Sequence, residues 1–195
     1  MKAGSSFERV EPESRQQWRE WLAENHAGSP GVWIVYRKPK SGLPSLTYDE
    51  AVEEALCFGW IDSTVNALDE YRFMQMMTPR KPGSTWAQTN KRRVERLIAE
   101  DLMTPAGMAV IEAAKADGSW TMLDDVENLV VPDDLAAALA ENPEAESTFS
   151  AFAPSAKKPI LYYIKSAKRP ETRARRIEKT VRMAARGLRV GVDKE

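Results

Sequence analysis

The sequence predicts an α+β fold: a small antiparallel sheet packed with helices, followed by a C-terminal helical module. Runs rich in β-branched and aromatic residues occur between residues 32 and 78, bounded by turn residues. From residue 132 onward the pattern is helical throughout. At 195 residues, with 43% apolar residues, the chain is long enough to bury a core. We therefore predict an α+β domain over residues 1–118, a linker over 119–131 and a helical module over 132–190.

The first helix and the first strand are predicted from residue spacing and residue type. Trp18, Trp21 and Leu22 lie on one helical face, which predicts a helix over about residues 13–25. A turn rich in glycine follows it. Residues 32–36 then read Val-Trp-Ile-Val-Tyr, which is typical of a strand.

The second helix and a β-hairpin come next. Thr47 followed by Glu50 forms a capping box, which predicts a helix that ends near Gly59. Residues 60–68 and 71–78 both resemble strands, and the short polar turn between them predicts a hairpin.

A second capping box, Thr85 followed by Gln88, predicts a helix that begins there. Its apolar face would contain Trp86, Asn90, Val94, Leu97 and Ile98. Asn90 is therefore expected to be a polar group within an apolar stripe, with a definite hydrogen-bond partner. A short helix over residues 105–116 follows, with proline at its first position.

The C-terminal module is predicted to contain four helices, the last of which is basic. Residues 157–189 carry 12 Lys and Arg against two Glu, whereas residues 1–156 carry 15 against 25 Asp and Glu. This asymmetry suggests an anionic partner. The candidate polyanion-binding residues are Arg173, Arg175, Arg176 and Arg182. An apolar stripe on the same helix predicts that it is docked rather than free, so nucleic-acid binding is the less favoured alternative.

The composition argues against several classes of site. A single cysteine and a single histidine exclude an internal disulfide and any Cys or His cluster, so we expect no metal and no cofactor. The first ten residues contain no apolar signal segment, and no run approaches the roughly 20 apolar residues that span a bilayer. We therefore expect a cytoplasmic protein without membrane insertion.

Several motifs combine rare residues in a fixed order. A run from Ala55 to Ser63 contains Gly-Trp-Ile-Asp-Ser, and it is followed by Thr-Pro-Arg at residues 78–80, Ser-x-Trp at 84–86 and Met-x-Pro-x-Gly at 103–107. A basic block occupies residues 167–177. This order resembles the YdeI/OmpD-associated family of bacterial proteins, also called bacteriocin-protection proteins. The resemblance implies a stress or resistance context. The family name also implies a porin association, which the missing signal peptide argues against.

The loop before the helix at residue 85 is a candidate anion site. Arg80 and Lys81 lie in a Pro79–Gly83 loop that leads into a helix N-terminus, where backbone amides and cationic side chains converge. The alternative is that Arg80 forms a structural pair with Asp62. Our first interpretation is a non-enzymatic protein that binds an anionic or amphipathic ligand or protein partner there. The candidate ligand-binding residues are Trp60, Asp62, Arg80, Lys81, Ser84, Trp86 and Asn90.

The competing interpretation is a small-molecule enzyme. Asp62 follows two aromatic residues, Phe58 and Trp60, and a carboxylate near aromatic surface can act as a general acid or base. In this interpretation Arg80 clamps an anion and Asn90 orients the substrate. The sequence contains no evident nucleophile, metal set or nucleotide fingerprint, which favours binding over catalysis. In either case we expect Asp62 and Arg80 to lie within hydrogen-bonding reach or around one pocket.

Overall fold

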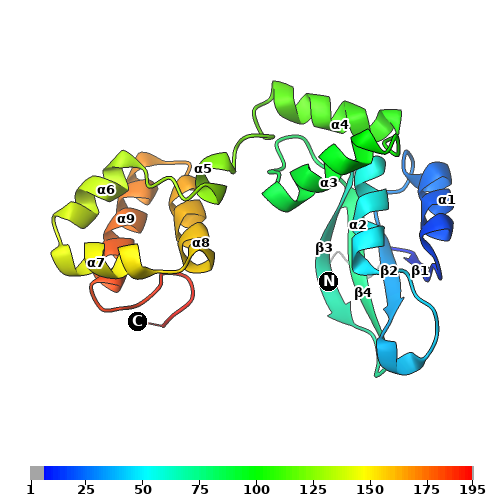
Figure 1. The fold of residues 1–195 in the computed structure, drawn as a ribbon, viewed down its shortest axis with the longest axis horizontal. Helices are drawn as coiled ribbons and strands as arrows, with labels where there is room; N and C mark the ends of the chain where they lie inside the picture. The colour runs from blue at the N-terminus through cyan, green and yellow to red at the C-terminus, as the bar shows by residue number, and fades with distance from the viewer. Residues whose placement is uncertain (1–6, 195) are drawn as a thin grey trace. The chain divides into compact units, whose positions relative to one another are not determined.

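The computed structural model describes residues 7–194, which form two compact units that divide between Thr121 and Met122 (Figure 1). Each unit has a separate hydrophobic core. The fold class is α+β as predicted, with a small sheet in the first unit and helices only in the described part of the second.

The sheet of the first unit has four strands in the order β1-β2-β4-β3. Strands β3 (Trp60–Ala67) and β4 (Arg72–Pro79) form the predicted hairpin, and β2 (Val32–Arg37) pairs antiparallel with β4. The sequence did not predict β1 (Arg9–Val10), which pairs parallel with β2 and makes the sheet mixed. Two residues are too short a run to produce an alternating pattern.

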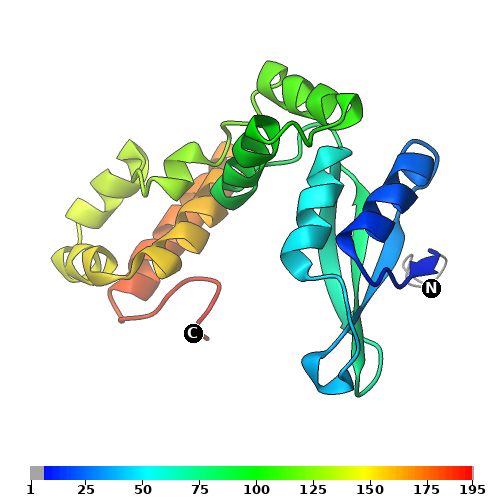
Figure 2. The ribbon, with the colours of Figure 1, turned by 45° about the vertical axis from the view of Figure 1, so that its right-hand side comes forward.

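Helices α1 (Arg15–Asn25) and α2 (Tyr48–Cys57) lie against one face of this sheet (Figure 2). The α2 helix begins with the predicted capping box, because the Thr47 hydroxyl accepts from the Glu50 amide while the Glu50 carboxylate accepts from the Thr47 amide. Between these helices and the sheet lies a core of large buried side chains, among them Trp18, Leu22, Ile34, Leu56, Trp60 and Met77.

Helix α3 (Gln88–Ala99) begins later than its sequence predicts. The N-cap is Ala87, without a side-chain cap, so the predicted capping box at Thr85 is wrong. The reason is tertiary: Trp86 turns inward against Trp120, and the Thr85 carbonyl accepts a hydrogen bond from Arg80. The apolar face is also narrower than predicted, because Asn90 is half-buried and Ile98 is 45% exposed.

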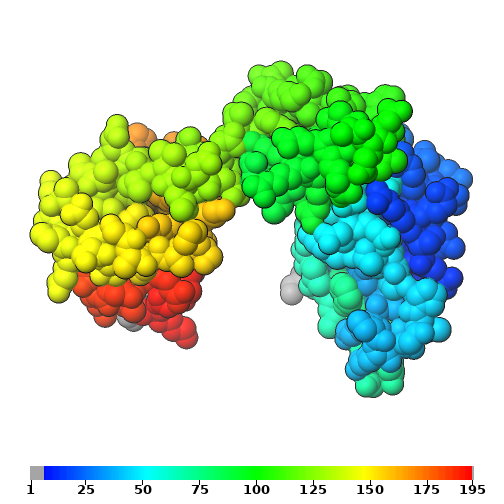
Figure 3. All heavy atoms as spheres, viewed as in Figure 1, coloured from blue at the N-terminus to red at the C-terminus, as the bar shows by residue number. Residues whose placement is uncertain are grey.

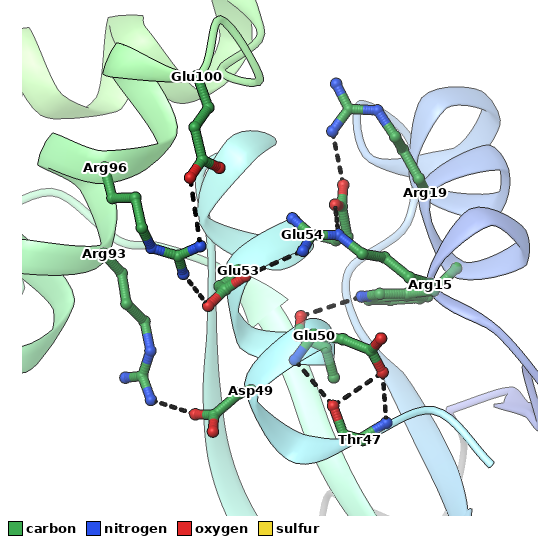
Figure 4. A network of polar contacts seen from close by, with 12 residues as sticks. Arg15, Arg19, Thr47, Asp49, Glu50, Glu53, Glu54, Arg93, Arg96 and Glu100 are labelled. Carbon is green, nitrogen blue, oxygen red and sulfur yellow. Dashed lines mark hydrogen bonds and ion pairs between the residues drawn. The ribbon is translucent and has the colours of Figure 1, made fainter.

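Five charged residues join helices α1, α2 and α3 to one another (Figure 4). Glu54 on α2 is almost fully buried and accepts from Arg15 Nε at 2.5 Å and Arg19 Nη1 at 2.6 Å. Its neighbour Glu53 accepts from Arg15 and from Arg96 of α3. The first unit ends with α4 (Pro105–Ala116) and the turn after it, which reaches Thr121.

The second unit is a helical bundle. The basic helix α9 (Pro170–Ala184) packs against three neighbours, α6 (Asp133–Ala140), α7 (Pro143–Ala151) and α8 (Pro154–Lys165). A short α5 (Asp124–Glu127) precedes them. The segment after α9, red in Figure 3, contributes the buried Val190 to the core of this unit. The prediction that the basic helix is docked is therefore confirmed within this unit.

Cys57 provides a direct check on the packing between α2 and its neighbours. The thiol is fully buried, and burial followed by the negative charge of Glu54 raises the pKa of Cys57 to about 11. We expect native protein to give almost no reaction with Ellman's reagent at pH 8, whereas protein in guanidinium gives one thiol per chain. Rapid reaction of the native protein, at the rate of a small free thiol, would contradict this burial.

Candidate functional site

Arg80 is a buried cation at the end of β4. Its backbone amide donates to the Gly59 carbonyl at 3.0 Å, which fixes the start of the loop, and its guanidinium lies over the Trp86 ring at 3.7 Å from the centroid. The residue is only 7% exposed. Burial lowers the pKa of Arg80 to about 10, an effect that the charge of Asp62 partly opposes. The side chain therefore stays charged at neutral pH.

The hydrogen-bonding capacity of this guanidinium is only partly used. Nη1 donates to the Thr85 carbonyl at 2.9 Å. Nε and Nη2 are buried and have no partner within the described part of the chain, and the same holds for Trp86 Nε1. A buried donor without an acceptor costs about 1 to 3 kcal/mol, and more when it carries charge. Three such donors on two stacked side chains indicate that an acceptor belongs beside them.

A small pocket of about 70 Å³ lies at these side chains. Its wall is formed by the loop after β4, by the last turns of α4 and by the turn that follows; the lining residues are Arg80, Lys81, Pro82, Gly83, Ser84, Trp86, Val110, Ala113, Ala114, Asp117 and Ser119. We call it the Arg80 pocket.

Asp117 joins the two sides of the Arg80 pocket. Its carboxylate accepts from the Gly83 amide at 3.1 Å and from the Ser119 amide at 2.8 Å. Hydrogen bonding from Ser119, with a smaller contribution from Gly83, lowers the pKa of Asp117 below its ordinary value. This carboxylate is therefore occupied in holding the loop against the end of α4.

The surroundings of the pocket are rich in cations and aromatic rings. Trp86 contacts Trp120 with ring centroids 4.8 Å apart. The ammonium groups of Lys91 and Lys115 lie over the Trp120 ring at 5.4 and 5.9 Å. Positive charge thus approaches both tryptophans, and the charge of Lys115 is already paired with Glu112 at 2.9 Å.

Two family models match the chain. Residues 10–110 match the family described as "Domain of unknown function (DUF8412)", which covers more than half of the chain. The chain belongs to this family. Residues 128–187 match "Bacteriocin-protection, YdeI or OmpD-Associated", so the predicted family is confirmed at the level of the C-terminal domain. Comparison with curated proteins and with solved structures gives no significant match.

The two matches divide the sequence motifs between them. The motifs at residues 55–63, 78–80, 84–86 and 103–107 lie inside the DUF8412 match. The basic block at residues 167–177 lies inside the YdeI/OmpD-associated domain. Over residues 7–194, no helix is both long enough and apolar enough to cross a membrane.

The Arg80 pocket brings together four of the seven candidate ligand-binding residues of the DUF8412 region. Arg80, Lys81, Ser84 and Trp86 all line it. Trp60 does not, because its ring is buried in the core and its Nε1 donates to the His26 carbonyl at 3.3 Å.

Asp62 belongs to a different polar group. Its Oδ2 accepts from Gln75 Nε2 at 2.8 Å and from the Tyr48 hydroxyl at 3.2 Å, and the Tyr36 hydroxyl donates to Gln75 Oε1. Burial raises the pKa of Tyr48, and the negative charge of Asp62 raises it further. The predicted hydrogen bond between Asp62 and Arg80 is therefore wrong, and Asp62 does not line the Arg80 pocket.

Asn90 also lies outside the pocket. Its Oδ1 accepts from Arg93 Nη1 at 3.2 Å, and Arg93 in turn pairs with Asp49 on α2. The prediction that Asn90 lies within an apolar stripe is wrong. Asn90 is only half-buried, and its partner is a half-buried arginine at the helix surface.

Sequence reasoning missed Asp117, Ser119 and Trp120. The predicted linker begins at residue 119, so the prediction places Ser119 and Trp120 in a connection between domains. The signal that was available is Trp120 itself, since a large aromatic residue near the end of a predicted helix usually packs against a core.

The arginines of the YdeI/OmpD-associated domain serve partly as packing contacts. Arg173 makes two hydrogen bonds to Asp134 on α6, and Arg176 donates to the Tyr163 carbonyl and lies over the Tyr163 ring. Arg175 and Arg182 are exposed. Two of the four candidate polyanion-binding residues thus hold α9 in place.

A wider groove of about 870 Å³ lies between α6 and α9. Its floor is apolar, with Ala138, Ile177 and Val181, and its rim carries acidic and basic side chains together. None of the unpartnered buried polar atoms in residues 7–194 lies on this groove. The smaller Arg80 pocket is therefore the better candidate site, because its atoms specify the chemistry of a ligand.

Proposed function

We propose that the DUF8412 region binds a small anionic ligand in the Arg80 pocket, and that the chain is a non-enzymatic cytoplasmic protein. The YdeI/OmpD-associated domain supports a stress or resistance context through its family description. The observation that carries the proposal is the buried guanidinium of Arg80, which has two nitrogen donors, Nε and Nη2, without an acceptor and no carboxylate in ion-pair range among residues 7–194.

The energetic argument concerns charge as well as hydrogen bonding. A charge removed from water is costly unless it is paired, and a ring face compensates only part of that cost. A water molecule in the pocket would supply acceptors but would leave the positive charge unneutralised. An anion supplies both. The loop is already held by Gly59 and Asp117, so little ordering is needed on binding.

Binding is better supported than catalysis. The enzyme alternative needs Asp62 and Asn90 beside the anion held by Arg80, but Asp62 bonds to Gln75 and Tyr48, and Asn90 to Arg93. A general acid or base must reach the proton that it transfers. Nucleic-acid binding by α9 is weakened in the same way by the internal pairing of Arg173 and Arg176.

Thermal unfolding with inorganic phosphate, sulfate and acetate at constant ionic strength tests the proposal. At about 100 times its dissociation constant, an anion that binds the Arg80 pocket stabilises the protein by about 2.7 kcal/mol. We expect this stabilisation in the unmodified protein and in Arg92→Gln, which removes an exposed positive charge from α3. Arg80→Met is expected to lose it.

General salt effects are separated by the same comparison, because excluded anions stabilise all three proteins equally. In the absence of added anion we expect Arg80→Met to be as stable as the unmodified protein within about 1 kcal/mol, or more stable, since an apolar side chain avoids the desolvation of the charge. Equal responses of Arg80→Met and Arg92→Gln to every anion would refute the proposed function.

A further inference from the structure

Strand β3 lies at one edge of the sheet, because the strand order is β1-β2-β4-β3. Within residues 7–121, the elements that pack closely against it are β4, on its inner side, and α2. Figure 1 shows no helix or strand of the first unit on the outer side of its second half. Residues 63–67, which read Ser-Thr-Val-Asn-Ala, are all exposed. The second half of β3 is therefore an open edge.

The hydrogen bonds of the hairpin show which backbone groups of β3 point away from β4. Near the turn, the Leu68 amide donates to the Arg72 carbonyl at 3.2 Å, so Leu68 points toward β4. Backbone groups that point toward and away from the partner alternate along an antiparallel strand. The N–H and C=O groups of Ala67 and Val65, in register with β4, therefore point to the open side.

The side chains of this edge do not oppose pairing with another strand. Open edges of soluble proteins normally carry a lysine, another charge or a proline that blocks association. Residues 63–67 contain none of these, and Val65 is 56% exposed. A register shift between Asp62 and Val65 leaves residues 65–67 as the regular part of the open edge. This short segment is suited to accept a strand.

We infer that β3 pairs antiparallel with β3 of a second copy of this chain, through residues 65–67, and so joins two four-stranded sheets into one. In a two-fold pairing each edge meets itself, so a charged edge repels its copy and an uncharged edge does not. The opposite edge of the sheet, β1, has only two residues and is too short to take the place of β3. Pairing therefore closes at two copies and does not continue as a fibre.

A pairing centred on Asn66 uses the outward groups of both copies. Val65 of one copy then lies opposite Ala67 of the other, and the two pairs form about four backbone hydrogen bonds across the interface. The two Asn66 side chains face each other, and each amide has both a donor and an acceptor to offer. Because the interface is small, we expect a dissociation constant on the order of 100 µM.

Sedimentation of the full chain from about 5 to 500 µM measures this equilibrium. Val65→Lys adds a charge to the edge, and Val65→Pro removes an N–H that does not serve the ladder with β4. Val192→Lys is the matched control, because Val192 is also 56% exposed but lies in the second unit. We expect both Val65 variants to raise the dissociation constant at least about tenfold, and Val192→Lys to leave it within about twofold.

Hydrogen exchange of the unmodified protein tests the pairing without any substitution. The outward amides of Val65 and Ala67 should become protected as the protein concentration rises, because the second copy supplies their acceptors. The Leu68 amide should be equally protected at all concentrations, since it already donates to Arg72. A monomer over the whole concentration range overturns the inference. A dimer that Val65→Lys does not weaken, or whose Val65 and Ala67 amides gain no protection, uses another surface and also overturns it.

Discussion

Replacement of Gly107 by alanine is expected to destabilise the first unit by about 3 kcal/mol or more. A Cβ atom at Gly107 would lie 2.2 Å from the Cys57 carbonyl oxygen and 2.8 Å from that of Leu56. Both contacts are with backbone, so no side chain can turn away to relieve them. The close approach is reinforced by Thr104, whose hydroxyl donates to the same Cys57 carbonyl at 2.6 Å.

Denaturant unfolding followed by circular dichroism measures this effect, and Gly28→Ala is the matched control. An alanine Cβ at Gly28 meets no atom within 4 Å, and its backbone is not in the left-handed region. We expect Gly28→Ala to change the free energy of unfolding by no more than about 0.5 kcal/mol. Similar losses in the free energy of unfolding for the two substitutions would show that α4 does not approach the end of α2 this closely.

The second large effect is expected for Glu54→Ala, with a loss of about 3 kcal/mol, at the lower end of the range for breaking a buried ion pair. The Glu54 side chain is 2% exposed and accepts from Arg15 and Arg19 (Figure 4). Its removal leaves both guanidinium groups without this partner and leaves a cavity. The two arginine side chains are 32% and 30% exposed, so water recovers part of the cost.

Glu100→Ala provides the control within the same set of charges. Glu100 is exposed and lies 3.7 Å from Arg96 in an i,i+4 pair, which is worth at most about 0.5 kcal/mol. Unfolding of both variants in urea, monitored by tryptophan fluorescence, compares them directly. A Glu54→Ala cost as small as that of Glu100→Ala would mean that the buried carboxylate contributes little to the joining of α1 and α2.

The two capping boxes illustrate how much of the fold is encoded locally. Thr47 with Glu50 and Thr85 with Gln88 carry the same signal in sequence, yet only the first caps a helix. At the second, contacts with Trp120 and Arg80 hold residues 84–87 in a non-helical conformation. Periodicity therefore predicted which elements exist, while long-range contacts determined where one of them begins.

The residues of the candidate site show the same difference between local pattern and long-range contact. Arg80, Lys81, Ser84 and Trp86 lie within seven consecutive residues, so local chemistry sufficed to group them. Asp117 and Ser119 reach the pocket from a separate helix end, and no local pattern connects them to Arg80. Whether a donor lacks a partner depends on the positions of individual atoms and not on residue type, so the sequence does not show it.

The position of Trp120 has a practical consequence for fragments of this protein. Trp120 contacts Trp86 beneath the guanidinium, yet the first unit ends only one residue later, at Thr121. A fragment that ends at residue 118, the boundary that the sequence predicts, would lack both Trp120 and Ser119, so its Arg80 pocket would be incomplete. A fragment that extends to Thr121 keeps all the residues that line the Arg80 pocket. Residues 119–121 therefore determine whether anion binding can be tested on the isolated unit.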